Sequence, residues 1–232
     1  MRIGLFSTLL IIVTSVIALD SIDAASITGE VKFKEAPPKL PVVKISKDQD
    51  YCGEIFRNET YLVDRDGGFQ NVVVFIEAAP ISRADPQKEN ILDNTGCRYS
   101  PRVMAMQKGE RLKVRNNDPK LHIPHSYLDE ITVFNLSLPF RGTTIDATQK
   151  IRHPGVLKVF CDTHAWMQAY IHVFDHSFFA VTDEHGMFSI DNVPPGTYTL
   201  RAWHEDAGMR SEEITVPENG DTRVHLAFTK NP

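Results

Sequence analysis

A seven-residue stretch, Cys161-Asp-Thr-His-Ala-Trp-Met167, brings a thiol, an imidazole and a thioether into one short turn. Residues 156–160 before it and 169–174 after it have the apolar, β-branched and aromatic character of strands. We therefore expect a loop held between two strands of a sheet. Soft sulfur ligands with imidazole suit copper, and two His, one Cys and a long axial Met form the blue-copper arrangement.

That arrangement requires a second histidine from elsewhere in the chain. The stretch Asn116-Asn-Asp-Pro-Lys-Leu-His-Ile-Pro-His125 offers His122 and His125, after a predicted strand at 112–115. A loop could turn either imidazole inward. Because Ile123-Pro124 restricts the backbone between them, we do not expect both to bind one ion.

The spacing C-x2-H-x2-M resembles the ligand loop of the amicyanins. An Asn six residues before a ligand His, as Asn116 is before His122, resembles plastocyanin-type cupredoxins. The His-x2-His spacing is also amicyanin-like, and in that family the first His is the ligand. The resemblance covers about residues 27–175 and implies a Greek-key β-sandwich whose copper ligands are His122, Cys161, His164 and Met167. The chain departs from the family at Ile123, where an Asn usually links the first His to the Cys loop.

Three expectations concern aromatic and histidine side chains around this motif. The resemblance implies that electrons pass through an exposed edge of His164, with Trp166 in an apolar collar around that edge. His172 should point to the opposite face of its strand and reach the surface. Trp203 and His204 are expected to be a packed indole and a hydrogen-bonded imidazole rather than a second metal site.

The N-terminal residues 1–25 have the features of a signal peptide: Arg2, an apolar run over 5–19, and small residues before a cleavage site. The apolar run is shorter than the ~20 residues of a membrane span, and no second such run follows it. Cleavage is therefore favoured over a retained anchor. If Cys161 is a metal thiolate, Cys52 and Cys97 are free to form a disulfide in an oxidising compartment. We expect a periplasmic or secreted protein.

The rest of the sequence predicts an all-β chain. No segment of residues 27–175 shows a sustained 3.6-residue period, and short strand-like runs such as 27–35, 71–76 and 103–106 are separated by Gly and Pro turns. Many short strands between such turns favour antiparallel sandwiches.

The C-terminal residues 176–232 have a character of their own. The pattern over 178–200, with turns at Glu184-His-Gly186 and Pro194-Pro-Gly196, resembles the carboxypeptidase regulatory-like, transthyretin-like β-sandwich. About 57 residues are marginal for an independent core. We therefore expect this domain to pack tightly against the cupredoxin-like domain, and a strand borrowed from residues 27–80 would complete it.

These features together predict an exported mononuclear, type 1-like copper protein that carries electrons. The resemblance implies redox partners such as a c-type cytochrome or a dehydrogenase. A net charge of −5 with 42% hydrophobic residues gives no basic surface for nucleic acid. Two alternatives stay open: a copper-dependent enzyme or copper-storage protein, and a structural binding module with a vestigial site. An enzyme would need an open coordination position, whereas the complete set of four ligands argues against a vestigial site.

Overall fold

The computed structural model describes residues 25–218 and 220–230. The predicted signal peptide lies outside the described residues except for Ala25, which begins β1. The expectation of an all-β chain is confirmed, since helical structure in the described part is limited to the single turn α1 (Gln49–Cys52) and the 3-10 turn η1 (Thr148–Lys150). No helix within these residues is long and apolar enough to cross a membrane.

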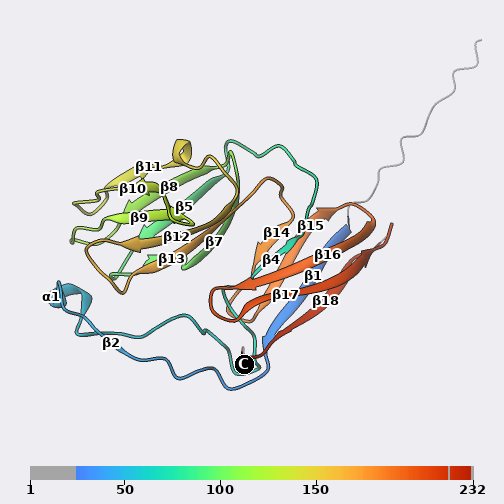
Figure 1. The fold of residues 1–232 in the computed structure, drawn as a ribbon, viewed down its shortest axis with the longest axis horizontal. Coiled ribbons are helices and arrows are strands. Elements are labelled where there is room, and N and C mark those ends of the chain that lie inside the picture. The colour runs from blue at the N-terminus through green and yellow to red at the C-terminus, as the bar shows by residue number, and fades with distance from the viewer. Residues whose placement is uncertain (1–24, 219, 231–232) are drawn as a thin grey trace, which may run out of the picture.

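The first sandwich contains the Cys161–Met167 loop and consists of two facing sheets (Figure 1). The five-stranded sheet has the order β10 (Ile131–Asn135), β9 (Pro124–Leu128), β12 (Gly155–Cys161), β13 (Gln168–Phe174) and β7 (Val103–Gln107). The four-stranded sheet has the order β11 (Thr144–Asp146), β8 (Arg111–Asn116), β5 (Glu89–Asn94) and β6 (Tyr99–Ser100). Several neighbouring strands are not consecutive in the chain, so connections cross between the two sheets.

The second sandwich is built from both ends of the chain. Its three-stranded sheet has the order β15 (Met187–Val193), β1 (Ala25–Phe33) and β18 (Thr222–Phe228). Its four-stranded sheet has the order β14 (Phe179–Val181), β4 (Val73–Ile76), β16 (Gly196–His204) and β17 (Gly208–Val216). Two strands from the N-terminal third of the chain, β1 and β4, thus occupy inner positions of the sheets that hold the C-terminal strands. Residues 176–232 alone would leave both sheets without these inner strands.

Side-chain alternation explains which faces are covered. Along β1 every second residue is buried, as expected for a strand with one face on a core. The five residues from Ala169 to Val173 in β13 are all buried. Ile171 and Val173 face the core of the first sandwich, whereas Tyr170 belongs to a cluster shared with the second. Strand β13 is therefore covered on both faces.

The interface between the sandwiches is mainly an apolar layer. It is formed by outward-facing side chains of β7, β12 and β13 against those of β4, β14 and β16, including Val73, Val103 and Tyr170 at its centre. At its margin Arg102 and Glu205 form a bidentate ion pair of 2.7 Å with both side chains at least nine-tenths buried. The expectation of two tightly packed sandwiches is confirmed.

For two histidines at or beside this interface, one expectation from the sequence is wrong and the other is confirmed. His172 does point to the outer face of β13, but it is 3% exposed, because Trp203 packs 4.3 Å from it, measured between ring centroids. The expectation that His172 reaches the surface is therefore wrong. His204 is hydrogen-bonded as expected: its Nε2–H donates to Thr60 O, and its Nδ1 accepts from two backbone N–H groups.

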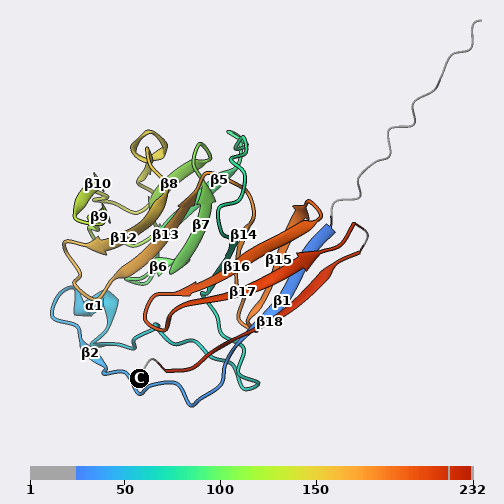
Figure 2. The same ribbon diagram turned by 45° about the vertical axis from the view of Figure 1, so that its right-hand side comes forward.

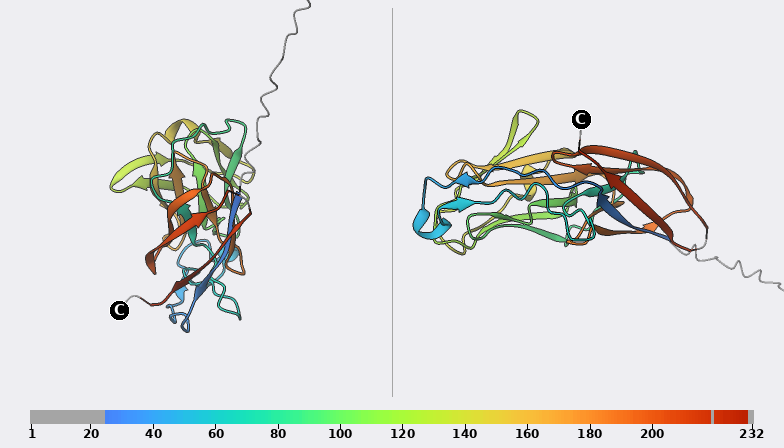
Figure 3. Two further views of the ribbon diagram at one scale, coloured as in Figure 1. Left: turned by 90° about the vertical axis from the view of Figure 1, so that its right-hand side faces the viewer. Right: turned by 90° about the horizontal axis from the view of Figure 1, so that it is seen from below.

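A long excursion of the chain connects the two sandwiches in space. After β1 the backbone runs to the loop end of the first sandwich, forms β2 (Val43–Lys44), α1 and β3 (Ile55–Phe56), and returns toward β4 (Figures 1 and 2). We call residues 43–56 the cap segment. Figure 3 shows it at one end of the elongated molecule, away from the strands of the second sandwich. Ile45 and Phe56 anchor the cap segment in the first core.

Candidate metal centre

The Cys161–Met167 loop leaves the sheet as predicted. Cys161 is the last residue of β12, and β13 begins at Gln168, directly after Met167. The turn is closed by two backbone bonds, in which His164 N–H donates to Cys161 O and Met167 N–H donates to His164 O. Because β12 and β13 pair along their length, the loop is held on a rigid base.

His122 reaches the same place from the segment between β8 and β9. Its backbone exchanges two hydrogen bonds with Leu138. Asn116 shapes the approach, because its Nδ2 donates to Lys120 O and Leu138 O and its Oδ1 accepts from Asp118 N–H. The role of Asn116 is thus to fix the loop that carries His122.

Three ligand atoms converge at the meeting point of these loops. Cys161 Sγ lies 3.9 Å from His122 Nδ1 and 3.8 Å from His164 Nδ1, and the two Nδ1 atoms are 3.1 Å apart. All three residues are buried. Three ligands spaced at 120° around one ion, at ~2.0 Å for nitrogen and ~2.3 Å for sulfur, would lie about 3.5–3.7 Å apart. The observed triangle is close to those dimensions.

Both imidazoles are turned with Nε2 toward a carboxylate. His122 Nε2 lies 3.0 Å from Asp118 Oδ2, and His164 Nε2 lies 3.0 Å from Asp48 Oδ2. An ionised carboxylate only accepts, so each Nε2 carries the proton and each Nδ1 presents a lone pair. Two lone pairs 3.1 Å apart repel one another unless a cation lies between them. This donor set therefore fits a metal ion, with the carboxylates orienting its ligands.

Both carboxylates are held ionised by their surroundings. Burial opposes ionisation of Asp118, but the backbone N–H groups of Gly96 and Cys97 and the Tyr51 hydroxyl bring its pKa below its ordinary value. Burial also opposes ionisation of Asp48, and the contacts with His164 and Lys120 outweigh it, so its pKa is lowered too. Each acts as an acceptor at neutral pH.

The Cys161 thiol has the electrostatics of a ligand. Burial alone would raise its pKa, yet the contacts of the sulfur with His122, His164, Thr163 and the backbone N–H of Ile123 lower the pKa to about 5. The Ile123 N–H lies 3.4 Å from Sγ, and Asp162 N–H donates to Ile123 O. The backbone of Ile123 therefore links the His122 segment to the Cys161 loop. The thiolate is the metal-binding form of Cys.

The remaining sequence candidates fall into two groups. Met167, the last residue of the Cys161–Met167 loop, is buried and packs in the first core. His125 turns outward instead: Nδ1 contacts Asp162, and Nε2 lies 3.0 Å from Thr132 Oγ1. The structure thus brings His122, Cys161 and His164 together and leaves His125 on the outer side of β9.

The expected exposed edge of His164 is wrong. The imidazole is 0% exposed, because the cap segment places Asp48 over its Nε2. Trp166 lies beside His164, at 5.0 Å between ring centroids, but it is buried and donates its indole N–H to Cys97 O. Its indole packs inward against the first core, so it does not form an apolar collar at the surface.

The cap segment is fastened to the site at several points. The predicted disulfide between Cys52 and Cys97 is confirmed, with Cα atoms 5.5 Å apart. The Tyr51 hydroxyl donates to Asp118 Oδ1, 2.8 Å away. Lys120 from the His122 loop contacts both Asp48 and Asp50. A further cluster of Cys97, Asp118 and His122 offers no separate metal site, because the Cys97 sulfur is in the disulfide.

Sequence reasoning missed Asp48 and Asp118. Asp118 had a weak signal, since it precedes His122 by four residues in the loop after Asn116. Asp48 had none, because it lies in a Pro- and charge-rich stretch 116 residues from His164. The one local indication is Cys52, because its disulfide with Cys97 holds α1, and with it the neighbouring Asp48, close to the first sandwich.

Comparisons with solved structures find partial likenesses to copper proteins. A Cu-containing nitrite reductase from Thermus scotoductus SA-01 is 18% identical (TM-score 0.33), and the match covers 43% of this chain and 25% of that one. A Cu(I) amicyanin variant is 16% identical (TM-score 0.32), covering 44% and 98%. A purple cupredoxin from Nitrosopumilus maritimus is 23% identical (TM-score 0.31), covering 38% and 100%. The chain thus spans about a quarter of the nitrite reductase, and likenesses this low leave the function to be argued from the side chains.

A family model described as polysaccharide lyase family 4, domain II, matches residues 150–224. That range runs from the end of the first sandwich, including the Cys161 loop, through most of the second. It is less than half of the chain. No curated protein matches the chain.

Proposed function

We propose that this protein is an exported electron carrier that binds one copper ion through His122, Cys161 and His164, with Met167 as a weak fourth ligand. The observation that supports it is the buried triangle of one thiolate and two Nδ1 lone pairs. A thiolate and two imidazoles in a trigonal arrangement, with a weak axial thioether, form the blue-copper donor set. Bound copper supplies one-electron chemistry by alternating between Cu(I) and Cu(II).

The surrounding residues would keep the ligands in place during that exchange. Each histidine is fixed at its far nitrogen by a carboxylate, and Cys161 is fixed by Ile123 N–H and Thr163. Ligands held this way are already in position, so little needs to rearrange when the charge on the ion changes. That property suits an electron carrier.

Burial favours a carrier over an enzyme. His122 and His164 are 0% exposed, and Cys161 is 4% exposed. A copper enzyme needs an open position at which substrate can reach the ion. Here the cap segment lies over the outward side of His164, so electrons would pass through protein groups rather than to a bound substrate.

The proposed partner is another redox protein, such as a c-type cytochrome or a dehydrogenase. Tyr51, which contacts Asp118, and Leu121, which precedes His122, leave apolar surface in solvent. Phe140 follows the backbone partner of His122, Leu138, by two residues and is 73% exposed. Small apolar contacts suit the brief encounters of electron-transfer proteins, which bury less than ~1,200 Å². The Cys52–Cys97 disulfide supports a periplasmic or secreted location.

Copper titration of ligand variants tests the proposal. The wild-type chain should bind one equivalent of Cu(II), His122→Ala should weaken binding at least a hundredfold, and His125→Ala should leave it within about threefold. Loss of binding in His125→Ala with retention in His122→Ala would reverse the assignment. Absence of stoichiometric binding in the wild-type chain would favour a vestigial site, and several equivalents would favour storage.

A further inference from the structure

The interface between the two sandwiches contains a cavity that the copper proposal does not use. Its volume is about 410 Å³, within the range of small-molecule sites. Its walls include Phe75, Trp203 and Met209 from the second sandwich and Phe174 from the first, with His172 and His176 as polar members. His172 lies five residues beyond Met167 along β13, which is roughly 17 Å of strand. The cavity is therefore separate from the candidate metal centre.

His172 is an unusual wall residue, because one of its ring nitrogens is buried without a partner in the part of the chain that the structure describes. Its side chain is 3% exposed, and Nε2 is buried without a hydrogen-bond partner among the described residues. Burial lowers its pKa to about 3, so it is neutral at physiological pH. A buried polar group without a partner is costly, by about 1–3 kcal/mol. Such a group is more readily kept where a bound molecule satisfies it.

His176 adds a hydrogen-bond donor of known direction. Its Nδ1 accepts the backbone N–H of Phe178 at 3.1 Å, so the neutral ring carries its proton on Nε2. Burial lowers the pKa of His176, with Asp175 acting against this. The Asp175 carboxylate is itself paired with Lys108 Nζ at 2.8 Å. The cavity therefore presents neutral imidazoles and no unpaired charge from these groups.

The chemistry of the walls selects the class of ligand. Phe75, Phe174 and Trp203 offer ring faces and edges to a flat apolar molecule. His176 lines the cavity, and its Nε2–H can donate to an acceptor on that molecule. The neutrality of the walls disfavours a charged ligand. We propose that this cavity binds a small uncharged aromatic molecule that carries a carbonyl or hydroxyl oxygen, with its ring between the two sandwiches and its oxygen at the histidines.

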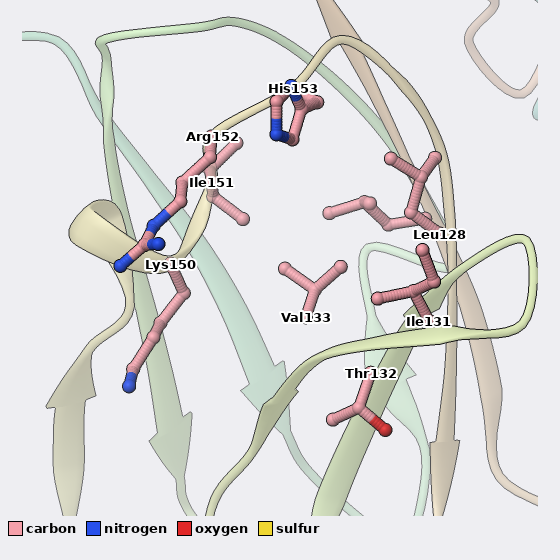
Figure 4. Close-up of a pocket in the computed structure, with 9 residues that line it drawn as sticks. Leu128, Ile131, Thr132, Val133, Lys150, Ile151, Arg152 and His153 are labelled. Carbon is pink, nitrogen blue, oxygen red and sulfur yellow. The ribbon is translucent and has the colours of Figure 1, made fainter.

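A second cavity provides a comparison for the aromatic walls of the first. It measures about 380 Å³ and lies beside the β9–β10 hairpin of the first sandwich. Figure 4 shows aliphatic side chains of Leu128, Ile131, Val133 and Ile151 facing one another, while Lys150 and Arg152 point away from the space between them. Its lining includes the imidazole of His153 but no Phe, Tyr or Trp, so it serves as the comparison site.

Fluorescence of Trp203 can report binding directly. The chain has two tryptophans, so Trp166→Phe leaves Trp203 as the single indole. In the full-length variant, acetophenone should quench Trp203 emission saturably. Benzoate has the same ring with a charge, and toluene has the ring without an oxygen; each should bind at least tenfold more weakly. Non-saturable quenching, or equal binding of the three probes, would overturn the proposal.

Variants then locate the site. With Trp166→Phe as background, His176→Phe keeps a ring but removes the donor, and acetophenone affinity should fall about tenfold. Ile131→Phe changes the comparison cavity of Figure 4 and should leave affinity within twofold. Unchanged affinity in His176→Phe, or loss of affinity in Ile131→Phe, would contradict the assignment. If His176→Phe fails to fold, the order of the three probes in the background chain still decides the outcome.

Discussion

The carboxylate of Asp48 lies 3.0 Å from Nε2 of His164, although 116 residues separate them in the chain. This contact closes the outward side of His164 and fixes which nitrogen faces Cys161. It also places a negative charge one imidazole away from the proposed copper. In the proposed copper centre the cap segment would therefore influence the ligands as well as cover them.

Replacing Asp48 should alter the redox properties of the copper protein. Asp48→Asn removes a charge that favours the more positive Cu(II) state, so the reduction potential should rise. Loss of the ligand-orienting carboxylate should also weaken copper binding by about 10- to 100-fold. Redox titration and a copper competition assay measure the two effects.

Asp50→Asn is the matched control for that variant. Asp50 lies on the same segment, carries the same charge, and pairs with Lys120 rather than with a ligand. Its side chain is 74% exposed, so solvent screens its charge. An equal rise in potential for Asp48→Asn and Asp50→Asn would show that net charge, and not the contact with His164, sets the effect.

The disulfide should stabilise the fold by closing a long loop. The bridge joins residues 45 apart, and the chain-entropy model gives about 4 kcal/mol for a loop of that length. The double variant Cys52→Ala/Cys97→Ala should lose about that much in the free energy of unfolding, measured by urea denaturation of the metal-free protein. A loss below ~1 kcal/mol would mean that the cap segment is held by its other contacts.

The ion pair between the sandwiches should be costly to break. Arg102 and Glu205 are both largely buried, so Arg102→Ala leaves an unpaired buried carboxylate and should cost about 3–5 kcal/mol. Arg115→Ala removes a similar bidentate pair with Asp93 in a far more exposed position and should cost little. Denaturant unfolding of both variants makes the comparison. Similar losses would contradict a desolvated pair at the interface.

Acid should destabilise the protein through His172. The folded-state pKa is about 3 and the ordinary value is 6.5, so between these the unfolded chain binds a proton that the folded chain does not. The contribution of His172 to stability is complete above pH 6.5 and falls by about 1.4 kcal/mol per pH unit as pH drops toward 3. His172→Phe should lessen the loss of stability between pH 6.5 and 4.5, measured on metal-free protein.

His185 provides the opposite case. It is exposed, and the hydrogen bond with Asp64 raises its pKa, so His185→Gln should not lessen the acid loss. His204, whose pKa burial lowers to about 4, contributes equally in all three proteins. If His172→Phe and wild type lose stability in parallel, His172 is not buried in the neutral form.

Local sequence patterns predicted those parts of the site that lie within one short stretch of the chain. The Cys161–Met167 loop lies between two strands as expected, and the Cys52–Cys97 pairing followed from the cysteine count. Burial of His172 could not be predicted in this way, because it depends on a second sandwich covering the outer face of β13. Alternation shows only that two faces exist, and not what packs on each.

Long-range placement explains the other differences. Strand β1 alternates and β4 is a short apolar run, and either pattern fits either sandwich. Only their pairing with β15, β16 and β18 assigns them to the second. Asp48 stands in a stretch without periodicity, so nothing local places it over His164. The covered His164 edge is thus a property of the tertiary structure, which the short motif does not contain.

The optical spectrum of the protein reconstituted with Cu(II) tests the central claim most directly. A thiolate bound to Cu(II) gives an intense visible charge-transfer absorption, because the transition runs from sulfur to metal. The wild-type chain should show that band at one copper per chain, and Cys161→Ser should lose it. A wild-type protein that binds copper without the band, or a Cys161→Ser variant with an unchanged spectrum, would contradict a His122–Cys161–His164 copper centre.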